Sequence, residues 1–284
     1  MARAINFGNL SESYSSLSGA AVVIVPVAYD GTSTWIKGAD KGPGAIIEAS
    51  ANMELYDIET DREVYRKGIF TDDALAAESS PEKMVEAVKG RVEEHIKRDK
   101  FVVVLGGEHS VSVGAAGAHC ERDDDISVLQ LDAHSDLRDE YNGSKYNHAC
   151  VMARVRELAP VVQVGVRSMD SGEKEFIDSR KIFFAKDICR GREWIENVVG
   201  RLSDKVYVTI DLDVFDTSIM PFVGTPEPGG LLWYDVLALL RTVFERREVV
   251  GFDVVELCPN EYSKACDFLA AKLVYKLLSY KFRE

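Results

Sequence analysis

Short apolar segments rich in β-branched residues alternate with amphipathic segments along the whole chain. The apolar segments lie at 21–27, 68–71, 101–105, 126–131, 161–166, 181–184, 206–210 and 249–255. Most are almost continuous in Val, Ile, Leu or Phe, whereas a strand with one solvated face alternates apolar and polar residues. These segments are therefore predicted to be strands of a parallel sheet that is buried on both faces.

Segments with helical periodicity lie between the predicted strands. The clearest run over 81–98, 110–119, 234–247 and 263–280. Ser80 followed by Pro81 is a favourable helix start, because Ser caps free N–H groups and Pro fits the first turn. No linker, repeat or change of composition divides the chain, so residues 1–284 are predicted to form one α/β domain with helices on both faces of the sheet.

The composition narrows the choice of partners and compartment. The 284 residues include 34 Lys and Arg against 47 Asp and Glu, a net charge of −13. This charge argues against nucleic acid and anionic membranes as main partners, since both attract basic surfaces. The apolar segment at 20–28 is too short to span a bilayer, and residues 1–18 lack the apolar core of a signal peptide. The five cysteines are widely spaced and form no CxxC motif, so we expect unpaired thiols that fill the core of a cytoplasmic protein.

Side chains that bind metals follow three of the predicted strands. These residues are His109, Asp132, His134, Asp136, Asp211 and Asp213. In an extended chain, residues two apart point to the same side. Parallel α/β sheets bind their ligands beyond the carboxyl ends of the strands. The six side chains are therefore expected to converge there.

Such a cluster would contain four carboxylates and two imidazoles. Carboxylates held close together repel one another, and two divalent cations would balance their charge. Oxygen-rich ligation with some imidazole suits Mn²⁺ better than a structural zinc ion. An isolated Asp after a strand is usually a turn residue or a helix cap. Six such residues at three strand ends instead favour a metal site.

Two further residues are candidates for chemistry. His148, in a loop that leads into a helix, is either a helix-start histidine or a proton shuttle beside the metals. Glu256 ends the last apolar segment and could pair with a cationic group of the substrate. Asp253 is expected to be a buried hydrogen-bond partner. His95 and His119 lie in helical segments without carboxylates at ligand spacing, so they are left out of the site.

Taken in order, these motifs resemble the ureohydrolase family, which includes arginases and agmatinases. The segments that carry the resemblance are Gly-Gly-Glu-His-Ser at 106–110, Asp-Ala-His-Ser-Asp at 132–136, Asp-Leu-Asp-Val-Phe-Asp at 211–216, Gly-Thr-Pro-Glu-Pro-Gly-Gly at 224–230 and Asp-Val-Val-Glu at 253–256. The resemblance implies a three-layer α/β/α sandwich around an eight-stranded, mainly parallel sheet, with two Mn²⁺ ions per subunit. It also implies a homo-oligomer, since relatives are commonly trimers or hexamers.

The resemblance further implies a role for each site residue. His109 and Asp136 would bind one manganese ion, His134 and Asp213 the other, and Asp132 and Asp211 would bridge them. Water activated by the cations would attack the guanidinium carbon of the substrate, giving urea and an amine. The catalytic residues would be Asp136, which passes a proton to the leaving amine, His148, which shuttles protons, and Glu256, which orients the guanidinium.

The loop at 137–147 bears on the substrate. It lacks the Asn, Ser and Thr series with which arginases hold the amino-acid end of arginine, and it resembles the agmatinase loop. Asp139 and Glu140 would repel a carboxylate if they face the pocket, whereas Arg138 could attract one. Asp170 either contacts the distal amine of the substrate, as in some relatives, or is a turn residue.

The expected reaction is the cleavage of agmatine to putrescine and urea, a step of polyamine biosynthesis. Arginine, guanidinobutyrate or another guanidino compound is the alternative substrate within this class. A non-catalytic metal-binding or regulatory homologue is the alternative of another class. Such a protein would not need to keep the six ligands together with His148 and Glu256. A zinc deacetylase of related architecture would be expected to keep one metal site with fewer ligands.

Overall fold

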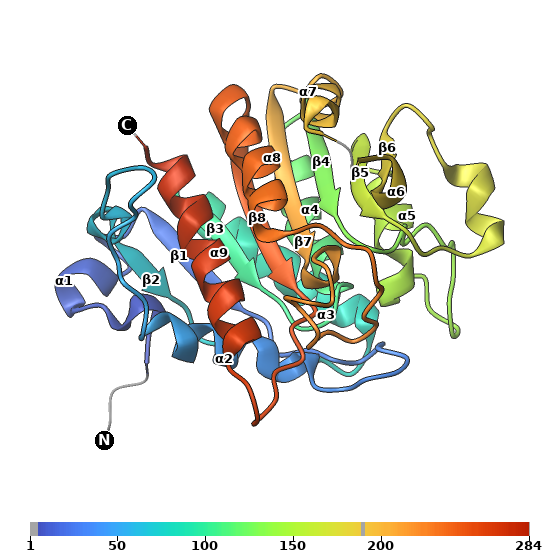
Figure 1. The fold of residues 1–284 in the computed structure, drawn as a ribbon. Coiled ribbons are helices and arrows are strands. Elements are labelled where there is room, and N and C mark those ends of the chain that lie inside the picture. The colour runs from blue at the N-terminus through green and yellow to red at the C-terminus, as the bar shows by residue number, and fades with distance from the viewer. Residues whose placement is uncertain (1–4, 189–190, 284) are drawn as a thin grey trace.

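A sheet of eight parallel strands forms the centre of the computed structural model, which describes residues 5–188 and 191–283 (Figure 1). The strands are β1 (Val22–Pro26), β2 (Ile69–Thr71), β3 (Phe101–Leu105), β4 (Ile126–Leu131), β5 (Val161–Val166), β6 (Ile182–Phe184), β7 (Lys205–Asp211) and β8 (Glu248–Val255). Their order is β2-β1-β3-β8-β7-β4-β5-β6, and every neighbouring pair is parallel. The predicted strands are confirmed, and β3, β4 and β5 have the predicted bounds.

Helices connect the strands. They are α1 (Glu12–Ser15), α2 (Gly42–Ser50), α3 (Pro81–Ile96), α4 (Val111–Cys120), α5 (Val151–Val155), α6 (Ala185–Ile188), α7 (Glu193–Val199), α8 (Trp233–Arg246) and α9 (Ala265–Lys281). The predicted helices are confirmed as α3, α4, α8 and α9, with small shifts at their ends. The side chain of Ser80 accepts a hydrogen bond from the N–H of Lys83, so the predicted cap of α3 is also confirmed.

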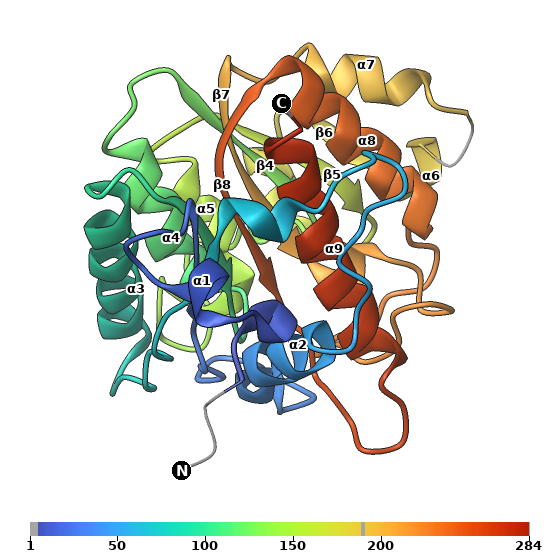
Figure 2. The same ribbon diagram turned by 90° about the vertical axis from the view of Figure 1, so that its left-hand side faces the viewer.

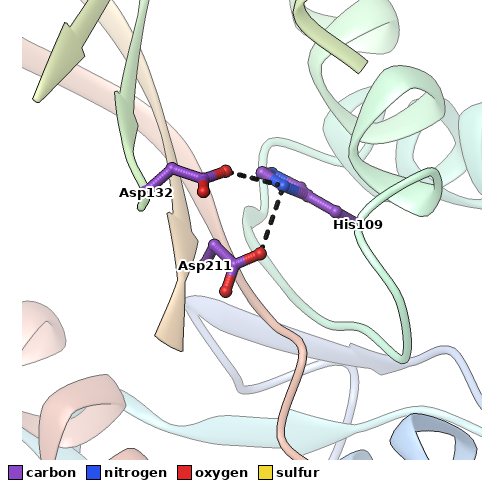
Figure 3. A group of neighbouring side chains, drawn as sticks. All are labelled: His109, Asp132 and Asp211. Atoms are coloured by element: carbon purple, nitrogen blue, oxygen red, sulfur yellow. Dashed lines mark ion pairs between the residues drawn. The ribbon is translucent and has the colours of Figure 1, made fainter. Parts of the chain in front are cut away.

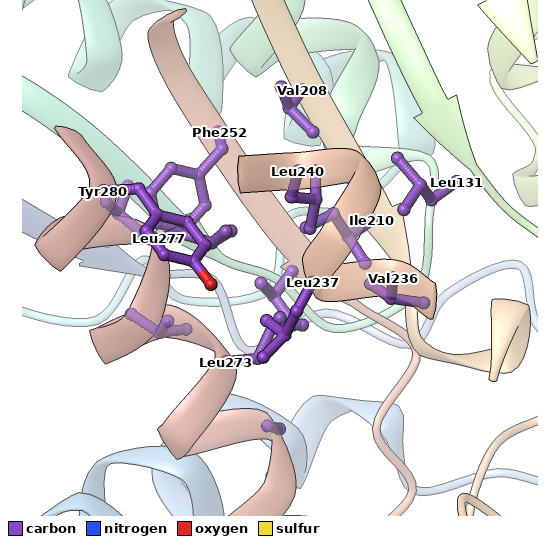
Figure 4. Close-up of a cluster of buried hydrophobic side chains, with 14 of the residues drawn as sticks. Leu131, Val208, Ile210, Val236, Leu237, Leu240, Phe252, Leu273, Leu277 and Tyr280 are labelled. Atoms are coloured by element: carbon purple, nitrogen blue, oxygen red, sulfur yellow. The ribbon is translucent and has the colours of Figure 1, made fainter. Parts of the chain in front are cut away.

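The two faces of the sheet are covered by different helices, which gives three layers (Figures 1 and 2). Val22 and Ile24 of β1 belong to the core shared with α2, α7, α8 and α9, whereas Val23 and Val25 belong to the core shared with α3, α4 and α5. Figure 4 shows the first core where side chains of α8 and α9 pack against β7 and β8. Both faces are buried, which explains the continuous apolar sequence of the strands.

The cysteines largely fill the core as predicted. Cys150, Cys258 and Cys266 are buried free thiols, and Cys120 is a free thiol that is partly exposed. Cys189 lies outside the described residues. Among the helices that the structure describes, none has both the length and the apolar character needed to cross a membrane.

Candidate metal centre

The predicted ligands meet at the carboxyl ends of the four central strands of the sheet. Because β3, β8, β7 and β4 are consecutive neighbours, the segments that follow them leave the sheet side by side. His109 follows β3, Asp132 follows β4, Asp211 ends β7 and Glu256 follows β8. The parallel order of the strands therefore brings together residues that are far apart in sequence.

His109 faces three carboxylates, two of which, those of Asp132 and Asp211, are drawn in Figure 3. Its Nδ1 atom lies 3.1 Å from Oδ2 of Asp132, 3.1 Å from Oδ2 of Asp136 and 3.5 Å from Oδ2 of Asp211. His109 is 1% exposed, and its carboxylate neighbours Asp132, Asp136 and Asp211 are buried as well. His109, Asp132 and Asp211 form one group whose ligand atoms all lie within 4.8 Å of one another.

A second group lies beside the first and shares Asp132 with it. Nδ1 of His134 lies 2.8 Å from Oδ2 of Asp213 and 3.5 Å from Oδ1 of Asp132. The ligand atoms of Asp132, His134 and Asp213 are again within 4.8 Å of one another. The two oxygens of Asp132 thus face two different histidines. A carboxylate placed in this way can hold two cations at once.

The hydrogen bonds of His109 suit a metal ligand. Its Nε2 atom lies 2.9 Å from Oγ1 of Thr209, and that hydroxyl donates to Oδ1 of Asp253 at 2.6 Å. Thr209 therefore accepts from the Nε2–H of His109. In the neutral imidazole, this order of donors leaves a free lone pair on Nδ1, which is buried without a hydrogen-bond partner and faces carboxylates. A cation bound between Nδ1 of His109 and the neighbouring carboxylates would give each of these atoms a partner. Asp253, which also accepts from the hydroxyl of Tyr207, is the buried partner that we predicted.

Charge repulsion gives a second reason for cations at this position. Burial, with the carboxylates of Asp213 and Asp132 close by, raises the pKa of Asp211 well above its usual range. Burial and the charge of Asp132 raise the pKa of Asp136 to about 7. Divalent cations would hold these carboxylates in their ionised form. The donor set of carboxylate oxygens and two imidazoles therefore fits divalent cations of the manganese type.

Two site residues adopt a backbone conformation that is rare for side chains other than glycine. The φ angle is 50° at Asp136 and 68° at Glu256. Hydrogen bonds hold both turns: the carbonyl of Asp136 accepts from the N–H of Ala153 at 3.1 Å, and the N–H of Glu256 donates to the carbonyl of Gly107 at 2.8 Å. Left-handed backbone at such residues is typical of functional sites, where the fold must impose it.

A pocket of about 260 Å³ opens above the two ligand groups. It is lined by Thr34, His109, His134, Ser135, Asp136, Arg138, Tyr141, His148, Ala149, Ser168, Met169, Asp170, Glu173, Asp211, Thr225 and Glu256. Asp132 and Asp213 are buried and do not line this pocket. The structure thus places His148, Glu256 and Asp170 around the same space as the predicted ligands.

Hydrogen bonds hold both Glu256 and His148 close to the proposed metal ligands. Oε1 of Glu256 accepts a 2.7 Å hydrogen bond from the N–H of His109 and lies 4.0 Å from Nδ1 of His148. Burial is the main reason that the pKa of His148 is lowered to about 4. The N–H of His148 donates to Oγ1 of Thr32, and that hydroxyl donates to Oε1 of the fully buried Glu108. The sequence interpretation missed Glu108 and Thr32.

Two other features differ from the sequence interpretation. Glu173 was missed, although it is buried at the pocket and accepts a hydrogen bond from the hydroxyl of Ser135. Asp139 and Glu140 do not line the pocket, so the condition under which they were expected to repel a substrate carboxylate is not met. The side chain of Asp139 instead pairs with Arg154 at 2.6 Å.

Comparisons with known proteins show which family the chain resembles. The model of the arginase family matches residues 20–279. An N(1)-aminopropylagmatine ureohydrolase of Synechocystis is 39% identical over 95% of this chain and 92% of its own length. An agmatinase of Pyrococcus horikoshii is 32% identical over 92% of each chain. The crystal structure of the agmatine ureohydrolase of Thermoplasma volcanium superposes with a TM-score of 0.88 at 30% identity, over 99% of this chain and 95% of the other.

These matches confirm both the predicted fold and the predicted class of enzyme, a hydrolase that acts on linear amidines. The parallel sheet that gathers His109, Asp132 and Asp211 at its carboxyl edge is therefore the scaffold shared with these relatives. The chain belongs to the arginase family.

Proposed function

We propose that the protein hydrolyses agmatine to putrescine and urea. The observation that carries this proposal is a pair of ligand groups sharing Asp132 beneath a pocket whose wall bears Glu256. Agmatine has a guanidinium at one end and an ammonium at the other, and a pocket rich in carboxylates suits both ends. Arginine would add a carboxylate, which such a pocket disfavours.

We assign the residues of the centre to two Mn²⁺ ions. His109 and Asp136 would hold one ion and His134 and Asp213 the other, with Asp132 and Asp211 between them. The distances from His109 to Asp136 and from His134 to Asp213, 3.1 and 2.8 Å, support this pairing. When bound, such cations supply Lewis acidity and lower the pKa of water at the site.

The remaining residues bind the substrate and move protons. The carboxylate of Glu256 accepts hydrogen bonds from the guanidinium N–H groups and so orients the guanidinium carbon for attack. Water adds to this carbon, and the bond from the carbon to the alkyl nitrogen breaks. Asp136 passes a proton to the leaving nitrogen, and His148 exchanges protons with solvent. One water is consumed for each urea and each protonated amine released.

N(1)-aminopropylagmatine is the second candidate substrate. The relative from Synechocystis, which is 39% identical to this chain, bears the name of an N(1)-aminopropylagmatine ureohydrolase. This compound carries the same guanidinium on a longer tail with one more amine, so the same bond would be broken. The products would be urea and spermidine.

Urea and amine, measured together, test the proposal. The protein loaded with Mn²⁺ is expected to release urea and putrescine from agmatine in equal amounts. Glu256→Gln is the variant that tests the role of Glu256, because it keeps the size of the side chain and removes the charge that holds the guanidinium. We expect this variant to retain its metal and to lose at least about 100-fold in kcat/KM. An unchanged rate would remove Glu256 from the site, and absence of urea in the wild type would contradict the proposed reaction.

A further inference from the structure

Two buried glutamines lie side by side in the sheet, next to the candidate metal centre. Gln130 of β4 and Gln163 of β5 are partners in the register of these parallel strands, and they are 0% and 6% exposed. Gln163 is the one polar side chain of β5. A buried amide costs free energy unless its polar atoms are bonded, whereas an apolar residue costs nothing of this kind. The two amides therefore indicate a role that depends on their hydrogen bonds.

The amide of Gln130 holds Asp132, the residue that both ligand groups share. Nε2 of Gln130 donates to Oδ2 of Asp132 at 2.7 Å. The backbone N–H of His134 donates to Oδ1 of Asp132 at 2.5 Å. Each oxygen of Asp132 thus has a protein donor of its own. Because Oδ2 faces His109 and Oδ1 faces His134, the two donors fix the rotation of the carboxylate that directs one oxygen to each histidine.

Gln163 fixes the direction of the Gln130 amide. Nε2 of Gln163 donates to the carbonyl of Ser135 at 2.7 Å and to Oε1 of Gln130 at 2.6 Å. A carbonyl can only accept, so the contact with Ser135 determines which end of the Gln163 amide is the nitrogen. Oε1 of Gln130 is then engaged as an acceptor, and its N–H groups are left for Asp132. A buried network whose members are bonded in this way rigidifies the segment around it.

We propose that Gln130 and Gln163 position Asp132 so that it can be shared between two cations. This inference rests on the proposed two-cation centre and names the residues that keep Asp132 shared. With Gln130 in place, the carboxylate keeps one oxygen toward each histidine before any cation binds. Without this donor, the carboxylate can turn and give both oxygens to the first cation, which leaves the second cation short of a ligand. Neither glutamine lines the pocket, so both act through Asp132 as positioning residues.

Gln130→Met tests this role, because methionine has nearly the length of glutamine and no N–H group. Titration of the metal-free wild type with Mn²⁺, followed by calorimetry, is expected to show two equivalents bound per chain. In Gln130→Met the second equivalent is expected to bind about 10–100-fold more weakly, the usual effect of removing the partner of a metal ligand. Ser127→Ala is the matched control, since Ser127 is a buried polar residue of the same strand whose hydroxyl accepts from the N–H of Ser203. This control is expected to bind both equivalents as the wild type does.

Electron paramagnetic resonance separates a change of position from a general loss of stability. At two Mn²⁺ per chain, the wild type is expected to give the spectrum of a coupled pair of ions, and Gln130→Met a larger share of isolated ions. Gln163→Met is expected to change the spectrum in the same direction to a smaller extent. Because Gln163 acts through Gln130, the loss of affinity in the double variant is expected to be smaller than the product of the two single losses.

The outcomes distinguish this inference from the proposed centre on which it rests. Two equivalents of unchanged affinity in Gln130→Met and Gln163→Met would overturn the inference and leave the two-cation centre standing. If Gln130→Met does not fold, Gln163→Met decides in the same way. Fewer than two equivalents in the wild type would refute the proposed centre and this inference with it.

Discussion

The hydroxyl of Thr32 accepts a 2.9 Å hydrogen bond from the backbone N–H of His148, although the two residues are 116 positions apart in the sequence. The same hydroxyl donates to the buried carboxylate of Glu108, one residue before His109. Thr32 therefore links the segment that carries His109 to the segment that carries His148. This link holds the backbone of His148 in a fixed position relative to His109 and the other proposed metal ligands.

Thr32→Val tests this link, because valine has the shape of threonine without its hydroxyl. The backbone N–H of His148 would lose its partner, at a cost of about 1–3 kcal/mol when such a group is buried. We expect kcat for agmatine to fall about tenfold while the bound metal is unchanged. Thr32→Ser keeps the hydroxyl and should retain most of the activity. Equal loss in both variants would show that the hydroxyl does not position His148.

His148→Ala tests the proton shuttle. His148 lines the pocket but lies outside both groups of ligand atoms within 4.8 Å. The variant is expected to keep its metal content and to lose about 10²–10⁴-fold in turnover, the usual contribution of a proton-transfer group. Metal analysis and urea release, measured on the same sample, distinguish a proton shuttle from a metal ligand. Loss of metal would make His148 a ligand instead.

Asp132→Ala tests the shared ligand. Asp132 is the common member of both ligand groups, so its removal should release both cations and abolish urea formation. Asp216→Ala is the control: this carboxylate comes from the same family motif as Asp211 and Asp213, yet it only caps a turn by accepting from the N–H groups of Ser218, Gly229 and Gly230. Two bound metals and near-full activity in Asp132→Ala would contradict the assignment.

His119 gives the protein a predictable loss of stability in acid. Its ring is buried against Tyr207, and burial lowers the pKa of His119 to about 4. In the unfolded chain, histidine titrates near pH 6.5. Between these values the unfolded state binds a proton that the folded state does not, so the free energy of unfolding falls as the pH falls from about 6.5 to about 4.

Metal-free wild type is therefore expected to lose about 2 kcal/mol more than His119→Gln between pH 7 and pH 5. Denaturant unfolding of both proteins at the two pH values measures this difference, and the carboxylates of the metal centre contribute equally to both. Parallel loss of stability in the two proteins would show that His119 is not the group responsible.

The strands and the clustering of the proposed ligands were predictable because both depend on local pattern. Continuous apolar residues identify β3, β4 and β5, and the spacing of two between Asp132 and His134 places both side chains on one side of the chain. Helix α2 was missed because it begins Gly42-Pro43-Gly44, which is typical of a loop.

The residues that support the site were not predictable in this way. Thr32 meets Glu108 across 76 positions, and no periodicity signals such a contact. Glu173 lies in a short 3₁₀ helix without an apolar pattern. Likewise, the direction of the Asp139 side chain depends on its pairing with Arg154, which only the folded loop determines.

The most direct test of the proposed function compares kcat/KM for agmatine and arginine with the same Mn²⁺-loaded protein. The pocket wall formed by Asp170, Glu173 and Arg138 carries a net negative charge, so agmatine is expected to exceed arginine by at least about 100-fold, since a misplaced charge costs several kcal/mol. A preference for arginine, or no urea from either compound, would contradict the proposed function.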